Sequence, residues 1–149
     1  MSAPFNFGQL KFLKALTEAL FHGAPMVISA DQVVANITEL FAKIGGTKLD
    51  EIRLSLTATE LVLGPLFAAV DVETRAHRIR NRLQNSQIDL FQDMARLRGI
   101  VYACYYGHWQ PGVEAGDQQA NAANPVHQQI GFTLPKFRVR GPADMAITR

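Results

Sequence analysis

Apolar residues recur every three or four positions through the first two thirds of this chain, and caps or Gly–Pro breaks divide the pattern into segments of helical length. This spacing places the apolar side chains on one face of a helix, whereas a half-buried strand needs strict alternation. Each such helix has to bury its apolar face against another element, and consecutive helices do so by packing together. The pattern therefore predicts an all-α fold, a small bundle of about five helices.

The first two helical segments have the clearest starts. Asn6 is the expected N-cap of a segment that runs to Gly23, and Gln9 stands three residues after it, as in a capping box. Ser29 and Gln32 repeat this spacing at the start of the second segment. The second segment has an expected buried stripe at helical spacing, formed by Val33, Ile37, Leu40 and Ile44.

The third segment, residues 47–70, allows two interpretations. Thr47 is a possible cap for a helix that carries Leu49, Ile52 and Leu56, yet the alternation of residues 53–57 is also typical of a short strand. We expect a helix, because the flanking patterns are helical and no second strand is available for pairing. The Gly–Pro pair at 64 and 65 should break or kink this helix.

The fourth and fifth segments complete the predicted bundle. Asp71 opens the fourth helix, whose expected buried stripe is Val72, Ala76, Ile79 and Leu83. The fifth helix, about residues 87–106, is apolar on two faces, which is typical of a helix in the middle of a bundle or between a bundle and a partner. One face carries Leu90, Met94, Leu97, Val101, Cys104 and Tyr105, and the other carries Ile88, Phe91, Ala95, Tyr102 and Tyr106.

The helical pattern stops after Gly107. Residues 107–149 hold four of the seven proline residues and five of the eleven glycine residues, both of which disfavour a helix. We therefore expect a helical domain over residues 1–106 and an extended C-terminal arm over residues 107–149. Such an arm either wraps its own bundle or reaches onto another chain. Because an exposed apolar arm is prone to aggregation, we expect it to dock on a partner subunit through its large apolar residues, which are Trp109, Val126, Ile130, Phe132, Leu134, Phe137 and Val139.

The residues with reactive or charged side chains form no metal, haem or nucleotide motif. The histidine residues lack the one-turn spacing of helical metal ligands, and neither a dinucleotide-binding nor a P-loop glycine pattern is present. Cys104 lies on a buried stripe, one turn before His108, so a core role is favoured over that of a nucleophile. We therefore expect no cofactor on this chain.

Two further features point to contacts with other molecules. Seven basic residues would suit the binding of nucleic acid, namely Arg75, Arg78, Arg80, Arg82, Lys136, Arg138 and Arg140. Acidic neighbours and the lack of a nucleic-acid-binding pattern instead favour a solvated face or a protein contact. The stretch YYGHW at 105–109 combines flat apolar area with hydrogen-bonding groups, which is typical of interfaces. It fits equally well a cluster that closes the end of the bundle.

Charge, cysteine content and hydropathy bear on the partner, the redox compartment and the location of the chain. Residues 1–70 carry five basic and six acidic side chains and residues 71–149 carry ten and seven, so an anionic contact is favoured in the second half. The single cysteine excludes an intrachain disulfide, and nothing in the sequence requires an oxidising compartment. The first residues lack a signal-peptide pattern, and the longest apolar run, 61–70, is about half of a membrane span. We expect a cytoplasmic chain without a transmembrane segment.

Three stretches together resemble a known family. They are QLKFLKALTEALFHG at 9–23, RLRGIVYACYYGHW at 96–109 and NPVHQQIGF at 124–132. This layout resembles the small helical subunit of flavin-dependent glucose–methanol–choline oxidoreductases, the gluconate 2-dehydrogenase subunit 3-like family, and also the helical N-terminal region of long-chain alcohol oxidases. In that family a Tyr-Tyr-x-His helix end precedes a segment like Asn-Pro-x-Trp-x-x-Ile-Gly-Tyr. Here Asn124, Pro125, Ile130 and Gly131 fit that segment, while His127 replaces the tryptophan and Phe132 the tyrosine.

The resemblance implies that FAD and the catalytic histidine belong to a separate, larger subunit, which the small subunit supports. It implies a hetero-oligomer whose interface on this chain includes Tyr105, Tyr106, His108, Trp109, Asn124, Pro125, Ile130, Phe132 and Phe137. Many family members carry a twin-arginine export signal, and the present sequence shows none.

The first hypothesis is therefore a non-catalytic small subunit of a FAD-dependent dehydrogenase acting on an alcohol, a sugar or a steroid-like substrate. The second is a free-standing helical interaction or regulatory protein. The third is a small helical enzyme or ligand-binding bundle that uses Tyr102, Cys104, Tyr106 and His108.

Overall fold

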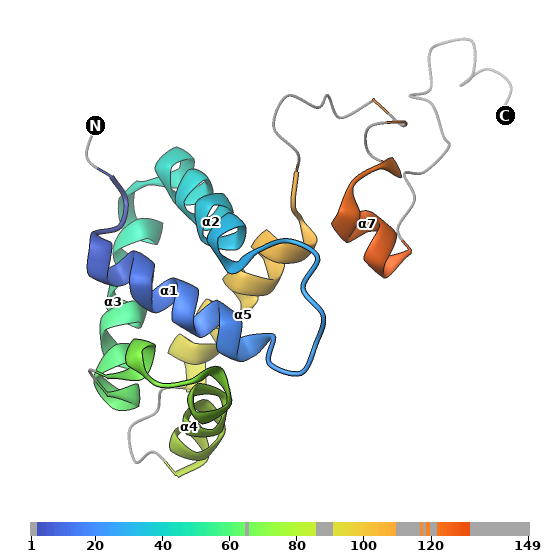
Figure 1. The fold of residues 1–149 in the computed structure, drawn as a ribbon. Helices are drawn as coiled ribbons and strands as arrows, with labels where there is room; N and C mark the ends of the chain where they lie inside the picture. Colours follow the sequence, from blue (N-terminus) through green and yellow to red (C-terminus); the bar gives the residue numbers. More distant parts are fainter. Residues whose placement is uncertain are drawn as a thin grey trace, which may run out of the picture. The chain divides into compact units, whose positions relative to one another are not determined.

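The computed structural model describes residues 3–64, 66–85, 91–109, 117, 119 and 122–131. Throughout this described part every regular element is helical and no strand is present, which confirms the predicted all-α fold (Figure 1). The chain divides into two compact units, Met1–Trp109 and Gln110–Arg149. The longer helices all belong to the first unit.

Helices α1 (Phe7–Leu20) and α2 (Ala30–Ile44) begin at the predicted caps. Asn6 Oδ1 accepts a hydrogen bond from the Gln9 amide at 2.8 Å, and the Asn6 amide donates to Gln9 Oε1 at 2.9 Å, so the capping box is complete. Ser29 Oγ accepts from the Gln32 amide at 3.1 Å, but the Gln32 side chain donates to Asn36 in place of closing a second box.

The buried face of α2 is rotated from the predicted stripe. Val33 and Ile37 are buried as expected, but Leu40 is 37% exposed and Ile44 is 50% exposed, so the prediction was wrong for these two residues. Val34 and Phe41 are buried in their place. Phe41 packs edge-to-face on Phe5, with ring centroids 5.8 Å apart, and this contact turns α2 toward the N-terminal segment.

Helix α3 (Gly46–Leu63) is continuous, so the alternative of a strand over residues 53–57 was wrong. Its N-cap is Gly45, which makes no side-chain cap, so the predicted cap at Thr47 was also wrong. The helix ends at Gly64, where φ is 96°, a backbone conformation that favours glycine. The short 3₁₀ helix η1 (Phe67–Ala69) follows, and the predicted break at the Gly–Pro pair is thereby confirmed.

Helix α4 (Val72–Asn85) begins after Asp71, as predicted. The Asp71 carboxylate accepts hydrogen bonds from the hydroxyl and the amide of Thr74, and these bonds lower the pKa of Asp71. Val72, Ala76 and Ile79 are only half-buried, and the side chain of Leu83 lies outside the described residues. Arg75, which flanks this stripe on the helix, is buried, so the described members of the stripe are less buried than predicted although they lie on the less exposed side of α4.

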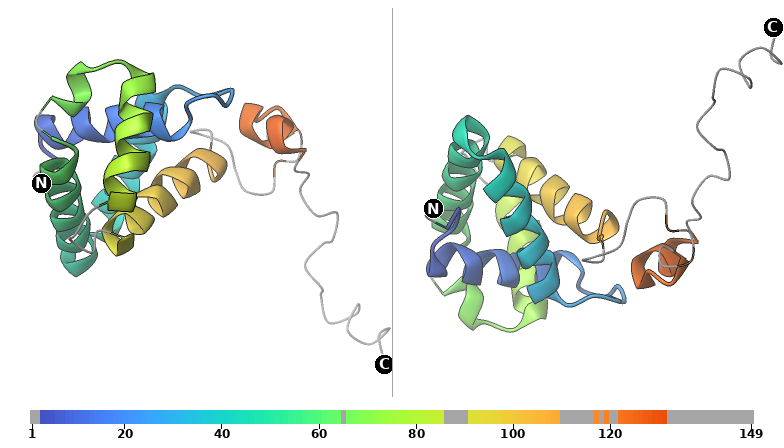
Figure 2. Two further views of the ribbon diagram at one scale, coloured as in Figure 1. Left: turned by 90° about the horizontal axis from the view of Figure 1, so that it is seen from below. Right: turned by 90° about the horizontal axis from the view of Figure 1, so that it is seen from above.

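Helix α5 (Phe91–Tyr106) packs against both α2 and α3, as two further views in Figure 2 show. The predicted first stripe is confirmed over its described members, which are Met94, Leu97, Val101, Cys104 and Tyr105. On the second face, Ala95 and Tyr102 are half-buried and Tyr106 is exposed. None of the helices described combines the length and apolar character that a membrane span requires.

In the second unit the described residues form the short helix α7 (Pro125–Ile130). The expectation of an extended chain was wrong for these six residues. Asn124 caps the helix, because its Oδ1 accepts from the amides of Val126 at 3.0 Å and His127 at 3.4 Å. Pro125 occupies the first turn, where its missing N–H costs no hydrogen bond, and Gly131 ends the helix in the left-handed region with φ of 68°.

Candidate functional site

Aromatic rings gather where α5 ends. Phe21, which follows α1, lies with its ring centroid 4.5 Å from that of Tyr105 and 5.3 Å from that of Tyr102. Tyr106 completes the group with its ring 4.9 Å from that of Tyr105 and nearly perpendicular to it. Edge-to-face and tilted contacts of this kind stabilise a cluster beyond the area that they bury. The sequence indicated the tyrosine residues but not Phe21, which packs against all three of them.

Tyr105 joins this cluster to the connection between α1 and α2. Its side chain is fully buried, and its hydroxyl accepts a hydrogen bond from the Val27 amide at 2.9 Å. Tyr105 therefore stabilises the bundle from within, because the α1–α2 connection covers this end of α5 and supplies a donor for the phenol oxygen. Its predicted role at a partner interface stays a prediction.

Asn36 of α2 contacts the last turn of α5 and His108 just after it. Its Oδ1 accepts from Gln32 Nε2 at 3.0 Å, and its Nδ2 donates to the Cys104 carbonyl at 3.0 Å. The same Nδ2 lies 3.0 Å from His108 Nδ1. The first two bonds identify Nδ2 as the donor of Asn36, so Nδ1 of His108 is the acceptor in this contact. Asparagine is a poor helix former, and its place inside α2 was the sequence signal for this role.

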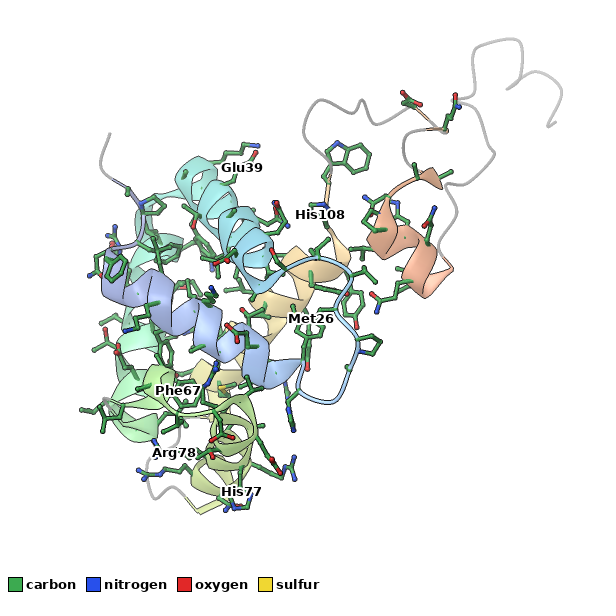
Figure 3. All side chains as sticks on the ribbon, in the orientation of Figure 1. Met26, Glu39, Phe67, His77, Arg78 and His108 are labelled. Carbon is green, nitrogen blue, oxygen red and sulfur yellow. The ribbon has the colours of Figure 1, made fainter. Side chains whose placement is uncertain are left out.

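His108 is buried as well, and its predicted role at a partner interface stays a prediction. The side chain is visible at the end of α5 in Figure 3. By contrast, Tyr106 is 44% exposed and Trp109 is 40% exposed. Two aromatic side chains near the end of α5 are thus partly exposed to solvent. Their neighbours Tyr105 and His108 form hydrogen bonds with the loop before α2 and with α2 itself.

Cys104 is a core residue with an unreactive thiol. Its side chain is buried, and burial raises the pKa of the Cys104 thiol to about 11. A nucleophilic cysteine needs the opposite shift, because the thiolate is the reactive form. The core interpretation of Cys104 is therefore supported by its environment, and the third hypothesis loses its proposed nucleophile.

The predicted interface residues of the second unit have different environments. Asn124 is buried as the cap of α7, Pro125 is half-buried in its first turn, and Ile130 is 48% exposed at its end. Phe132 and Phe137 lie outside the described residues. The Asn-Pro and Ile-Gly pairs of the family-like segment thus correspond to the start and the end of α7.

The arginine residues of α4 do not form a single solvated face. Arg75 Nη1 donates to the Ala15 carbonyl at 2.7 Å and Nε donates to the Val70 carbonyl at 3.0 Å, while Nη2 lies 3.6 Å from Glu18 Oε2. Arg75 therefore fastens α4 to α1. Arg82 Nη1 donates to the Val62 carbonyl at 3.0 Å, which places its guanidinium beside the last turn of α3.

The described residues contain no group of three His, Cys, Asp or Glu side chains suited to hold a metal ion. No protein-family model matches the chain, and neither a characterised protein nor a solved structure shows significant similarity to it. The candidate functional residues are Tyr106, at the end of α5, and Trp109, three residues later, because both side chains are exposed.

Proposed function

We propose that this chain is a non-catalytic small subunit that assembles with, and stabilises, a larger FAD-dependent oxidoreductase acting on an alcohol, a sugar or a steroid-like substrate. The family resemblance of residues 9–23, 96–109 and 124–132 suggests the class of partner. The observation that carries the proposal is the exposed pair Tyr106 and Trp109 at the end of α5. Aromatic residues of this kind dominate the binding energy of protein interfaces.

The rigidity of the end of α5 supports a role in docking. Tyr105 is held by the Val27 amide and His108 by Asn36, so Tyr106 and Trp109 project from a backbone with a fixed position. An ordered surface loses less conformational entropy on binding than a flexible one, so more of the interaction energy appears as affinity. Burying a large apolar side chain at such a surface contributes about 1.5–3 kcal/mol.

The chemistry of this region favours a supporting subunit over a small enzyme. The raised pKa of the Cys104 thiol keeps it protonated near neutral pH, and Nδ1 of His108 already accepts a hydrogen bond from Asn36. A free-standing interaction protein would use the same exposed aromatic residues. The two hypotheses differ in whether the bound partner carries a flavin.

Isolation of the tagged full chain from its native cells tests the proposal. We expect a yellow complex with flavin absorbance and a mass that fits one larger subunit with this chain. The double variant Tyr106→Ala/Trp109→Ala should remain folded and lose the flavoprotein. Ile44→Ala is the matched control, because Ile44 is similarly exposed on α2 and lies away from the end of α5.

Two outcomes would overturn the proposal. One is a stable partner without flavin, which would favour the free-standing interaction protein. The other is turnover of a substrate by the purified chain alone, which would restore the small-enzyme hypothesis. The Cys104→Ala variant should assemble and keep most of the activity of the complex, since its thiol is a core group.

A further inference from the structure

The positive charges of the described residues fall into two classes. Six lysine or arginine side chains lie within 4.0 Å of a carboxylate, namely Lys14, Lys43, Lys48, Arg53, Arg75 and Arg96. Five others have no ion pair within the described part of the chain, namely Lys11, Arg78, Arg80, Arg82 and Arg98. Three of these five belong to α4, so unneutralised positive charge is concentrated on one helix.

Two exposed leucine residues lie close in the sequence to Val62, whose carbonyl Arg82 contacts. Leu61 is 80% exposed in the last turn of α3, and Leu66 is 67% exposed just after it. The hydrogen bond from Arg82 to the Val62 carbonyl brings the end of α4 against this turn. Arg78 lies one turn before Arg82 on the same face of α4, and Figure 3 shows it extending toward the side where α3 ends. We call Leu61, Leu66, Arg78 and Arg82 the Leu–Arg surface.

We propose that the Leu–Arg surface binds an acidic amphipathic segment of a partner protein. The two leucine side chains offer apolar area to one stripe of such a segment, and the two guanidinium groups offer bidentate donors to carboxylates on its flank. A contact of this size belongs to the weak and transient class of interfaces. Its specificity comes from charge, since a basic segment would meet Arg78 and Arg82 with like charge.

Nearby acidic residues favour a discrete segment over an anionic membrane. Glu60 lies one residue before Leu61, and Asp71 and Glu73 are exposed at the start of α4. A flat anionic lipid surface repels these carboxylates while it attracts the arginine residues. A peptide segment, by contrast, places its own charges only where the arginine side chains are.

This inference goes beyond the proposed function and is independent of it. The Leu–Arg surface joins the end of α3 to α4, whereas Tyr106 and Trp109 lie at the carboxyl end of α5, away from α4 in Figure 1. A chain without a flavoprotein partner would still carry the Leu–Arg surface. Failure of either test leaves the other proposal standing.

The test uses the full chain and three probes, with binding followed by calorimetry at low and at physiological salt. The first probe is a synthetic helical peptide with leucine at helical spacing and glutamate on both flanks. The second is the same peptide with lysine in place of glutamate, and the third is vesicles that contain phosphatidylserine. We expect the glutamate peptide to bind at least about tenfold more tightly than the lysine peptide, with the preference weakened by salt.

The variants identify the surface that binds. Arg78→Glu/Arg82→Glu should reverse the preference between the two peptides, and Leu61→Ser/Leu66→Ser should weaken both by about tenfold or more. Lys11→Glu and Arg98→Glu are matched controls, because both residues are exposed and lack an ion pair within the described residues, and they should leave binding unchanged. Arg78→Glu alone serves as a second charge variant, since it leaves the Arg82 bond to Val62 in place.

Three results would overturn the inference. The first is equal affinity for the two peptides, and the second is an unchanged preference in the folded charge-reversal variants. The third is binding of the vesicles, but not of the glutamate peptide, with the same sensitivity to Arg78→Glu and Leu66→Ser, which would assign the surface to a membrane.

Discussion

At the scale of single residues, Arg75 shows how a charged side chain can hold a helical bundle together. Its guanidinium reaches two backbone carbonyls and one carboxylate from a buried position between α4 and α1. Hydrogen bonds from charged groups contribute about 1.5–3 kcal/mol each, and removal of one partner leaves a buried acceptor unsatisfied. The connection of α4 to α1 therefore includes polar contacts from a buried guanidinium.

Arg75→Met should lower the free energy of unfolding by about 2–4 kcal/mol, because it removes three polar contacts and leaves the Ala15 carbonyl without its side-chain donor. Urea unfolding followed by circular dichroism measures this loss. Arg78→Met is the control and should change stability by less than about 0.5 kcal/mol. A loss below about 1 kcal/mol for Arg75→Met would show that the buried guanidinium contributes no net stability.

The Cys104 thiol gives a second prediction at this scale. Its pKa is raised to about 11 by burial, so at pH 8 the folded chain should react with a thiol reagent roughly a hundredfold more slowly than the unfolded chain. Because the thiol ionises at lower pH in the unfolded chain than in the folded chain, burial of the neutral thiol is compatible with full stability at any pH below the unfolded pKa. The contribution of the buried thiol to stability is lost as the pH rises toward about 11. Rapid labelling of the native chain would contradict the buried position of Cys104.

At the scale of elements, helix ends were easier to predict than helix faces. Asn6, Ser29 and Asp71 each cap a helix as expected, because capping depends on residues close in the sequence. The buried faces of α2 and α4 depend on distant partners. Phe41 packs on Phe5 and Arg75 reaches Ala15, and neither contact is visible in a helical period.

The candidate site was predicted in part for the same reason. The stretch at 105–109 indicated an aromatic cluster, and such a cluster closes the end of α5. Which of its residues face solvent depends on Val27 and Asn36, which lie about 70 or more positions earlier in the chain. Helix α7 was missed because its six residues are too few for a period, although Asn124, Pro125 and Gly131 are a regular set of start and stop residues.

Asn124→Ala should destabilise α7 by about 1 kcal/mol, because the amides of Val126 and His127 lose their common acceptor. Backbone chemical shifts of residues 125–130 report the loss of helix. Asn124→Ser is the matched control, since a serine hydroxyl also caps a helix and should preserve most of the signal. Equal shifts in both variants would show that contacts other than the cap hold α7.

At the scale of the whole molecule, the division after Trp109 separates a helical bundle from the residues that follow it. The bundle holds five helices of ordinary length among its described residues, together with the buried core between them. A unit with its own core is able to fold alone. The family-like segment at 124–132 lies in the other unit.

A chain that ends at residue 120 should therefore keep the cooperative unfolding of the bundle and, if the proposed function is right, lose the proposed flavoprotein partner. Thermal unfolding and native mass measure the two properties independently. The full chain with Phe132→Ala is a milder companion variant, which should fold and bind more weakly. A truncated chain that does not fold would show that residues after 120 complete the bundle, and the docking role assigned to them would be wrong.

The position of Trp109 has a spectroscopic consequence. It is the single tryptophan of the chain, it is partly exposed, and it follows three tyrosine residues that cluster with Phe21. Its intrinsic fluorescence therefore reports on the end of α5 alone, without a label. Binding of another protein over this end of α5 would shift the emission of Trp109 to shorter wavelength and protect the indole from a soluble quencher. Binding of a peptide at the Leu–Arg surface would leave the emission of Trp109 unchanged.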